Sequence, residues 1–419
     1  MTMQRRDFLK VSAAGLAAAG FPLRAHAGAA KAKVVIVGAG FGGATAAKYI
    51  RMWDPAIEVT LIDREPKFVS CPLSNLVLAG LKTLDDITKT YDALKTKYGV
   101  NVVVDSVTAI DTDKRVVKTE QGSFAYDRLI LSPGIDFRFD QIDGYTAQAQ
   151  ERILHAWKAG EQTLKLRQQV ESMRDGGLIV IGMPLAPYRC PPGPYERVCL
   201  IANYLKRAKP KSKIIMLDAN PDVASKKPLF MKAWNTLYSD WVEYRPNSKV
   251  VKVDAEGMIA STEFEDIKAD VINIIPPQRA GQVAEMAGVR TDSNGVWCPA
   301  SFVTYESKAK PNVHVIGDAL LSNFPKSGHM ANNMGKVCAN AVVELLNGRQ
   351  PDPVPVVSNT CYSAVSEDRA IHIATVFRYD PAKDQMTAQP GGGISSDLSE
   401  EEAVYAEAWA ESIWSDTFL

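Results

Sequence analysis

Short apolar runs recur along the chain, and helix-like stretches follow them. The first run covers residues 33–37 and leads into a helix-like segment over 44–52, and a second run covers 57–62. A third run, residues 178–182, begins a similar unit. Apolar runs of strand length that alternate with helical segments predict parallel strands covered by helices. We therefore expect an α/β protein.

The turn after the first apolar run is rich in glycine. In the sequence VGAGFGG, Gly38, Gly40 and Gly43 separate the expected strand from its helix. Glycines let the backbone approach a pyrophosphate, and the helix N-terminus favours its negative charge. Asp63 ends the next run, where an acid can accept the hydroxyls of a ribose. The pattern predicts a dinucleotide site, and an ordinary glycine turn is the alternative.

Two later segments indicate which dinucleotide is bound. Residues 124–134, FAYDRLILSPG, resemble the second signature of flavoproteins with two dinucleotide-binding domains, and residues 311–319, PNVHVIGDA, resemble the third. In the third signature the aspartate, here Asp318, contacts the ribityl or pyrophosphate part of the cofactor. The three segments in this order predict FAD.

A helix is expected soon after Asp318, with Lys326, Ser327 and Gly328 at its start. A helix N-terminus directed at the pyrimidine edge of a flavin would stabilise the reduced, anionic ring through its dipole and backbone N–H groups. Cys338 lies within the same helix, and we expect it to be a small buried residue.

The unit that begins at residues 178–182 has a different turn. Where a nicotinamide-binding domain would continue with glycines, this chain has GMPLAPYRCPPGPYER. Proline has no backbone N–H and fixes φ, so this turn is unsuited to a pyrophosphate. We expect the fold of a nicotinamide-binding domain without nicotinamide binding, and hence a different electron donor.

The composition is that of an ordinary soluble globular protein. Of 419 residues, 46% are hydrophobic and 23% are charged. The 48 lysines and arginines balance the 48 aspartates and glutamates, so no overall field favours nucleic acid or an anionic membrane. No nucleic-acid partner and no membrane span are expected.

The N-terminus has the features of an export signal. Arg5 and Arg6 precede a small-residue apolar run that ends in the sequence AHA, which predicts a twin-arginine signal over residues 1–27, cleaved after Ala27. A membrane-anchoring helix is the alternative, but the run is shorter than the roughly 20 residues that span a bilayer. We therefore expect a periplasmic protein.

Export would place the six cysteines in an oxidising compartment. None has CxxC or zinc-type spacing, so no metal site is expected. Cys190, in the proline-rich turn, and Cys361, after a proline-rich connector, can meet beside a flavin as a redox-active disulfide. An inert disulfide, or no bond, is equally open. Cys71 follows the second strand and can tether FAD, although a buried free thiol is an alternative.

The chain resembles the flavoprotein subunit of flavocytochrome c sulfide dehydrogenase over nearly its whole length. The similar segments include VGAGFGG, SCPLSN, YDRLILSPG, YRCPPGPYER, VIGDA, NTCYS and the terminal IWSDTFL. The resemblance implies that Cys71 carries FAD through an 8α thioether, and that Cys190 and Cys361 form a redox-active disulfide. It assigns no role to Cys199 or Cys298, which we expect to pack in the core.

The resemblance also implies a reaction, the oxidation of hydrogen sulfide to sulfur or polysulfide. Hydrosulfide attacks the disulfide, giving a persulfide and a thiolate, and two electrons pass to FAD and then singly to a c-type, dihaem cytochrome subunit. This chain has no CxxCH motif of its own, so the cytochrome must be a separate partner.

Glu196, six residues after Cys190, is the expected general base for the incoming sulfide. This role needs a raised pKa in a partly desolvated pocket. A glutamate in a surface salt bridge is the alternative.

The expected fold class is α/β, with two Rossmann-like dinucleotide-binding domains, as in glutathione reductase, and a C-terminal interface domain. After the signal, the expected boundaries are 31–145 and 285–350 for the FAD-binding domain, 146–284 for the second domain and 351–419 for the C-terminal domain. In the terminal helix-like segment, an apolar stripe is expected to pack on the protein body because the opposite face is acidic. The stripe consists of Tyr405, Trp409, Ile413 and Trp414.

Three other functions are the alternatives to this one. A sulfide:quinone oxidoreductase shares the fold and disulfide chemistry but would need an apolar C-terminal membrane-docking surface. An NAD(P)H-dependent disulfide reductase or NADH dehydrogenase is disfavoured by the proline-rich turn. A non-catalytic electron carrier would not need three cysteines in reactive contexts.

Overall fold

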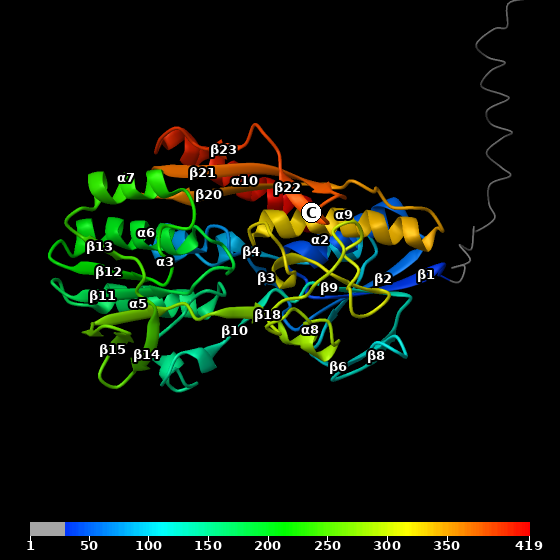
Figure 1. Cartoon of the computed structure of the whole chain (residues 1–419), viewed down its shortest axis with the longest axis horizontal. Helices are drawn as coiled ribbons and strands as arrows, with labels where there is room; N and C mark the ends of the chain where they lie inside the picture. Colours follow the sequence, from blue (N-terminus) through cyan, green and yellow to red (C-terminus); the bar gives the residue numbers. More distant parts are fainter. Residues whose placement is uncertain (1–29) are drawn as a thin grey trace, which may run out of the picture. The chain divides into compact units, whose positions relative to one another are not determined.

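Two parallel sheets organise the protein in the computed structural model. The structure describes residues 30–419, so the expected export signal, residues 1–27, lies outside the described residues. The first sheet has the strand order β19-β9-β1-β2-β5 (Figure 1). Its middle strand, β1, is buried at nearly every position because helices and loops cover both faces. The strands are β1 (Ala32–Val37), β2 (Ile57–Asp63), β5 (Asn101–Val104), β9 (Arg128–Leu131) and β19 (Val313–Val315).

Two long helices, α2 (Phe41–Trp53) and α9 (Gly328–Leu346), pack against each other beside this sheet. They approach so closely that a Cβ atom at Gly335 would lie 2.6 Å from the carbonyl oxygen of Gly42. A small antiparallel sheet lies at the lower right in Figure 1. It is formed by β6 (Val107–Asp111), β7 (Val116–Thr119) and β8 (Ser123–Ala125).

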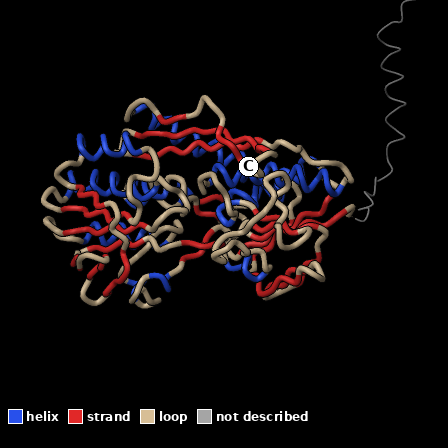
Figure 2. Tube along the Cα trace, in the orientation of Figure 1, coloured by secondary structure: helices blue, strands red, loops and turns tan. Residues whose placement is uncertain are grey.

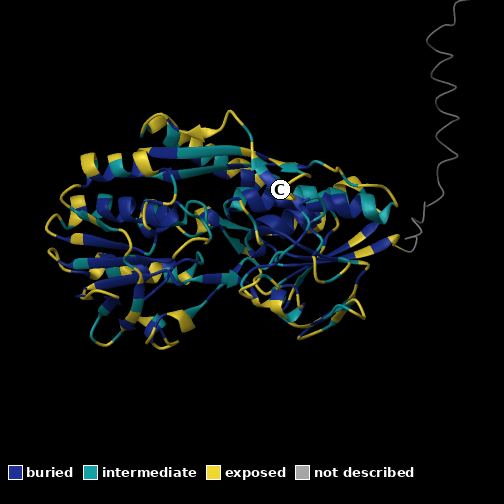
Figure 3. Ribbon diagram, in the orientation of Figure 1, coloured by how far each residue is buried: buried dark blue, intermediate teal, exposed yellow. Residues whose placement is uncertain are grey.

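The second parallel sheet repeats this arrangement with the order β13-β12-β11-β17. Figure 3 shows that the strands of both parallel sheets are mostly buried. The strands are β11 (Leu178–Met183), β12 (Lys213–Asp218), β13 (Val242–Arg245) and β17 (Val271–Ile274). The helices nearby are α5 (Glu161–Ser172), α6 (Gly193–Ala208) and α7 (Lys227–Leu237), and a second antiparallel sheet consists of β14 (Val250–Asp254), β15 (Ile259–Thr262) and β16 (Asp266–Lys268).

Two short antiparallel strands, β10 (Ile135–Phe137) and β18 (Gln278–Ala280), connect the parts of the chain that hold the two parallel sheets. The shorter elements are β3 (Phe68–Val69), β4 (Thr88–Lys89), α3 (Ser74–Leu78), α4 (Asp92–Thr96) and α8 (Gln282–Met286). The expected α/β fold with two dinucleotide-binding units is confirmed, whereas the domain boundaries stay predictions.

The C-terminal segment forms an antiparallel layer that spans both units (Figure 2). Its long strand β20 contacts both α9 and α6, so residues of β20 lie near the helices of both dinucleotide-binding units. The layer consists of β20 (Val356–Ala364), β21 (Ala370–Asp380), β22 (Gln385–Ala388), β23 (Gly393–Ile394) and α10 (Glu400–Phe418).

Helix α10 packs on the protein body, as expected, but the expected apolar stripe is only partly correct. Ile413 and Trp414 are buried and Trp409 is partly buried, whereas Tyr405 is 54% exposed. The buried residues of this helix include instead the small residues Ala406 and Ala410.

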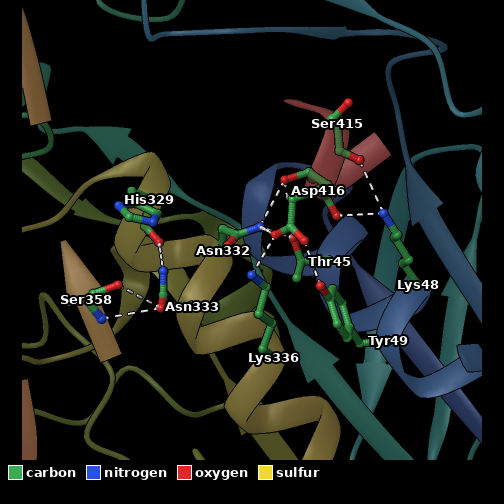
Figure 4. Close-up of polar contacts among 11 residues, drawn as sticks. Thr45, Lys48, Tyr49, His329, Asn332, Asn333, Lys336, Ser358, Ser415 and Asp416 are labelled. Atoms are coloured by element: carbon green, nitrogen blue, oxygen red, sulfur yellow. Dashed lines mark hydrogen bonds and ion pairs between the residues drawn. The ribbon is translucent and has the colours of Figure 1, made fainter. Parts of the chain in front are cut away.

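A polar network fixes the end of α10 against α2 and α9 (Figure 4). The Asp416 carboxylate accepts hydrogen bonds from Tyr49 at 2.6 Å and from Asn332 at 2.8 Å, and pairs with Lys336 at 2.7 Å. Lys48 donates to the carbonyl oxygen of Asp416 at 2.9 Å. These contacts hold the pKa of Asp416 below its usual range and keep the terminal helix in place.

Candidate functional site

A cavity of about 1000 Å3 lies between the two turns, the start of α9 and the C-terminal layer. Residues from distant parts of the sequence line it, because the carboxyl ends of the parallel strands and the strand β20 meet there. The sequence-predicted residues on its wall are Gly38, Gly40, Asp63, Cys71, Cys190, Glu196, Asp318, Ser327, Gly328 and Cys361.

The first turn, residues 38–40, has the geometry of a pyrophosphate cradle. Gly38 has φ +98°, and a Cβ atom there would overlap the carbonyl oxygen of Ser132. A Cβ atom at Gly43 would overlap the carbonyl oxygen of Gly38. Gly43 therefore does not line the cavity but allows the turn to close, while Gly40 leaves the backbone open toward it.

Asp63 ends β2 beside this turn. Its carboxylate accepts the backbone N–H of Ala39 at 2.6 Å and that of Glu65 at 3.0 Å. It lines the cavity, so one face of the carboxylate holds the turn while the side chain remains next to the position of a ribose.

Asp318 points an unsatisfied oxygen into the protein interior next to the cavity. Its Oδ1 atom is buried without a hydrogen-bond partner among the described residues, and burial raises the pKa of the carboxyl. A buried polar atom without a partner is costly, so a ligand with donor groups would stabilise it. The glycine turn and this orphaned carboxylate fit a bound dinucleotide.

Helix α9 begins where the sequence predicts, with Ser327 as its N-cap. The Ser327 hydroxyl accepts the N–H of Met330 at 3.1 Å, and Gly328 and Ser327 line the cavity. Lys326 does not line it. Its ammonium donates to the carbonyl oxygens of Asp318 at 2.9 Å and Leu320 at 2.6 Å, and burial lowers its pKa to about 8. Lys326 therefore supports the loop that carries Asp318.

The second turn, residues 184–192, places Cys190 against the cavity. Cys190 has φ +59°, and its N–H donates to the carbonyl oxygen of Lys326 at 2.8 Å. Cys361 reaches the same point from β20, and both cysteines are free thiols that are close enough to shift each other's pKa. The two loops meet as expected, and a disulfide between them stays a prediction.

The two thiols differ in acidity. The contact with Cys361, followed by burial, raises the pKa of Cys190 well above its ordinary value. The same contact, aided by the nearby Lys226 ammonium, lowers the pKa of Cys361 to about 7. Cys361 is therefore the more acidic thiol of the pair.

Strand β20 is fixed to the start of α9 by three contacts, so the position of Cys361 is well defined. His329 accepts the N–H of Thr360 at 2.9 Å, and Ser327 donates to Asn359 at 2.5 Å. Asn333 accepts the N–H of Ser358 at 3.3 Å (Figure 4).

Cys71 lies in the loop between β3 and α3 and lines the same cavity. Its carbonyl oxygen accepts the Ser74 hydroxyl at 2.7 Å, and the Trp414 indole donates to the neighbouring Ser70 at 2.9 Å. These bonds hold the thiol at the cavity wall. The thioether to FAD stays a prediction.

Glu196, on the first turn of α6, is partly buried between three parts of the chain. It accepts hydrogen bonds from Asn75 at 2.7 Å and from the N–H of Ala364 at 2.8 Å. Burial raises the pKa of Glu196 in spite of these bonds. Among residues 30–419 it forms no salt bridge, so the surface alternative is wrong and the expected raised pKa is confirmed.

Two further polar residues of this site, Asn75 and Lys226, were not among those predicted from the sequence. Asn75 joins Glu196 to Arg197, whose Nε donates to the Asn75 Oδ1 atom at 3.1 Å. Lys226 donates to the carbonyl oxygen of Cys361 at 2.9 Å. Asn75 follows Cys71 within the SCPLSN segment and was detectable, whereas Lys226 resembles any lysine at a helix start.

The other cysteines pack in the core as expected. Cys199, Cys298 and Cys338 are fully buried and lie outside the cavity lining. Burial raises the pKa of Cys298 to about 12, so these thiols stay protonated and unreactive.

Comparisons with known proteins agree with this site. A family model described as the central part of the sulfide dehydrogenase [flavocytochrome c] flavoprotein chain matches residues 163–276, and one described as flavocytochrome c sulphide dehydrogenase, flavin-binding, matches residues 353–418. Mitochondrial sulfide:quinone oxidoreductase from Mus musculus is 26% identical over 326 residues, covering 73% of this chain and 70% of that protein. The sulfide dehydrogenase [flavocytochrome c] flavoprotein chain from Chlorobaculum thiosulfatiphilum is 58% identical over 45 residues, which are 11% of this chain and 94% of that sequence.

Solved structures support the same fold. The sulfide:quinone oxidoreductase from Aquifex aeolicus superimposes with a TM-score of 0.75 at 18% identity, over 92% of this chain and 91% of that one. A putidaredoxin reductase, solved in its covalent complex with putidaredoxin, gives a TM-score of 0.64 at 20% identity, over 92% of this chain and 93% of that one.

The fold and the site define a flavoprotein oxidoreductase with two dinucleotide-binding domains. Within that class, the chain is similar to sulfide-oxidising flavoproteins, both to sulfide:quinone oxidoreductases and to the flavoprotein chains of flavocytochrome c sulfide dehydrogenases. The flavin-binding family model and these similarities indicate FAD, and the glycine turn and the orphaned Asp318 carboxylate on the cavity wall fit it. In residues 30–419 we find no helix with the length and apolar character required to cross a membrane.

Proposed function

We propose that this chain is the flavoprotein subunit of a periplasmic flavocytochrome c sulfide dehydrogenase. It oxidises hydrogen sulfide to sulfur or polysulfide and passes the electrons to a separate c-type, dihaem cytochrome. The observation that carries the proposal is that Cys190 and Cys361 meet beside Glu196 in the cavity that fits FAD. The two segments that match flavocytochrome c family models contain one of these cysteines each.

The chain's own residues divide the chemistry between them. In the oxidised protein Cys190 and Cys361 form the disulfide that hydrosulfide attacks. Glu196 accepts the proton of an incoming hydrogen sulfide molecule, because burial raises the pKa of the Glu196 carboxyl toward the pKa of hydrogen sulfide. When bound, FAD accepts an electron pair from the thiol site and can release the electrons one at a time.

Cys71 supplies the covalent link to FAD in this proposal. The thiol lies on the cavity wall, in a loop held by Ser74 and Trp414. Denaturing the purified protein and filtering it tests the link: the flavin stays with the protein in the parent and is released from Cys71→Ser. Release of flavin from the parent would refute the link without affecting the thiol chemistry.

The identity of the electron acceptor is the part of the proposal with a specific competitor. The sulfide:quinone oxidoreductase of mouse is similar over most of this chain, which favours a quinone. Against this, the exposed positions of α10 include Glu400, Glu401 and Glu411, and such a face would be repelled by an anionic membrane surface. We therefore favour a cytochrome.

A steady-state assay with sulfide decides between the two acceptors. We expect the purified chain to reduce a c-type cytochrome. In Cys361→Ser the rate of cytochrome reduction should fall by about 100-fold or more, because the disulfide can no longer form. A water-soluble ubiquinone analogue, at equal concentration, should be reduced much more slowly. Faster reduction of the quinone would make the chain a sulfide:quinone oxidoreductase.

A further inference from the structure

Lys226 is a buried cation next to the thiol pair. It is 4% exposed, and its ammonium donates to the carbonyl oxygen of Cys361 at 2.9 Å and to the hydroxyl of Ser363 at 2.8 Å. Both partners are neutral. The salt bridges formed by residues 30–419 include its neighbour Lys227, paired with Asp222, but not Lys226. A buried ammonium without an ion-pair contact is costly, and a thiolate formed beside it would stabilise it.

The backbone is bent to place this lysine inside. Lys226 has φ +53°, a conformation that is uncommon for a residue with a side chain, and it forms the N-cap of α7. The next residue, Lys227, points outward and is exposed. The strained turn therefore directs one lysine of an adjacent pair to the thiols and the other to solvent.

The groups facing Lys226 come from four elements. Cys361 is on β20, Cys190 is in the second turn, Glu196 is on α6 and Glu402 is on α10, and each of them raises the pKa of the lysine. Burial has the opposite and larger effect, so the pKa of Lys226 lies below its ordinary value. Of the two thiols, it is Cys361 whose own carbonyl oxygen binds the ammonium.

We propose that Lys226 is the positioning residue that decides which sulfur of the pair leaves as the thiolate. The inference rests on the proposed function. When hydrosulfide attacks Cys190, a bond forms between the substrate sulfur and Cys190, and the bond between Cys190 and Cys361 breaks. Its electron pair stays on Cys361 as a thiolate, so the substrate sulfur is oxidised and the Cys361 sulfur is reduced.

The ammonium favours this direction over the reverse. Attack on Cys361 would leave the negative charge on Cys190, whereas the hydrogen bonds of the ammonium go to Cys361 and Ser363 on β20. An opposite charge nearby stabilises a thiolate, so the better leaving group is the sulfur of Cys361. The persulfide consequently forms on Cys190, where the nearby Glu196 carboxylate raises the pKa of the thiol.

Peptide-resolved alkylation of the reduced, flavin-containing protein tests the inference. The rate of reaction of Cys361 with iodoacetamide is followed against pH, because only the thiolate reacts. Lys226→Met should raise the midpoint pH by about one unit or more, the effect expected for loss of an opposite charge within about 4–6 Å. Lys226→Arg should restore the parent midpoint.

Lys227→Met is the matched control, since it removes the exposed lysine next in sequence. Its midpoint should equal that of the parent. An unchanged midpoint in Lys226→Met, or an equal shift in Lys227→Met, would overturn the inference. If Lys226→Met does not fold, Ser363→Ala removes one of the two acceptors that hold the ammonium and should shift the midpoint in the same direction.

A second readout locates the persulfide. After one equivalent of sulfide, mass spectrometry of the alkylated peptides should find the added sulfur on Cys190 in the parent and on both cysteines in Lys226→Met. The alkylation profile uses no sulfide. A parent whose flavin is not reduced by sulfide would therefore refute the proposed function, whereas an unchanged alkylation profile with normal sulfide reduction would refute only the role of Lys226.

Discussion

The strand-turn-helix units β1-α2 and β11-α6 are the same arrangement built twice with different turns. Each strand is central in its parallel sheet, with β2 and β9 beside β1, and β12 and β17 beside β11. The first turn, residues 38–40, is short and closes on glycine, whereas the second, residues 184–192, is long, contains prolines and carries Cys190. One turn has the shape that a pyrophosphate needs, and the other holds a thiol.

The comparison shows that the same strand-turn-helix arrangement can carry either a dinucleotide-binding turn or a turn that holds a reactive side chain. The helix of the first unit begins with glycines on the cavity wall, while the first turn of the second helix carries Glu196, which is bonded to Asn75 and to Ala364. Under the proposed function, the second unit holds two thiols for the substrate at the place where a nicotinamide-binding turn would lie.

The largest effect is expected from a substitution that prevents the first turn from closing. Gly43→Ala should destabilise the protein by about 3 kcal/mol or more, because the new Cβ overlaps the backbone oxygen of Gly38, which has little freedom to move. Denaturant unfolding and the flavin content of the purified protein measure this. Gly40→Ala is the control within the same turn, since its Cβ would approach only the Phe68 ring, at 3.7 Å. Equal losses in the two variants would contradict the geometry of the turn.

An intermediate effect is expected at the second turn from Glu196→Gln. The amide keeps the shape of the side chain but accepts no proton, so the rate of flavin reduction by sulfide should fall by about 100-fold. Stopped-flow absorbance measures this rate. An unchanged rate would show that Glu196 only supports the loop.

Although Glu196→Gln should slow flavin reduction, it should make the folded protein more stable than the parent at higher pH. Because the folded protein raises the pKa of Glu196, the protonated form is favoured on folding, and the stability of the parent falls as pH rises from the ordinary glutamate range through the raised pKa. Glu196→Gln removes this loss, so its advantage in thermal midpoint over the parent should grow with pH. Calorimetry at several pH values follows the difference.

The sequence predicts the first turn better than the second. The glycines, Asp63 and Asp318 lie in segments whose spacing reports the fold directly, and the structure places them around one cavity, with Gly43 behind the turn. Lys326 was misplaced because its position next to a helix start does not reveal that its side chain turns away to bind two carbonyl oxygens.

At the second turn the sequence identified the cysteines and Glu196 but not what surrounds them. The contacts of Asn75 and Lys226 join residues more than a hundred positions apart, and no local pattern encodes them. Tyr405 was wrong for a related reason: helical spacing alone does not distinguish a stripe of large residues from the stripe of alanines that α10 buries.

The smallest effect is expected at Cys199, which is on α6 like Glu196 but lies outside the cavity. Cys199→Ala should cost about 1 kcal/mol of stability through lost packing and leave sulfide reactivity unchanged. Chemical unfolding and stopped-flow traces check the two halves of this expectation. Slower flavin reduction would mean that reactivity in this unit is not confined to the turn.

The central claim, that the second turn accepts electrons from sulfide and not from a nicotinamide, is tested most directly by anaerobic flavin reduction. The oxidised protein is mixed with sulfide or with NADH, and flavin absorbance is followed in the parent and in Cys190→Ser. We predict rapid bleaching by sulfide in the parent, none by NADH, and loss of the sulfide reaction in the variant. Bleaching by NADH, or a variant that reacts with sulfide as fast as the parent, would contradict the account and favour an NAD(P)H-dependent reductase.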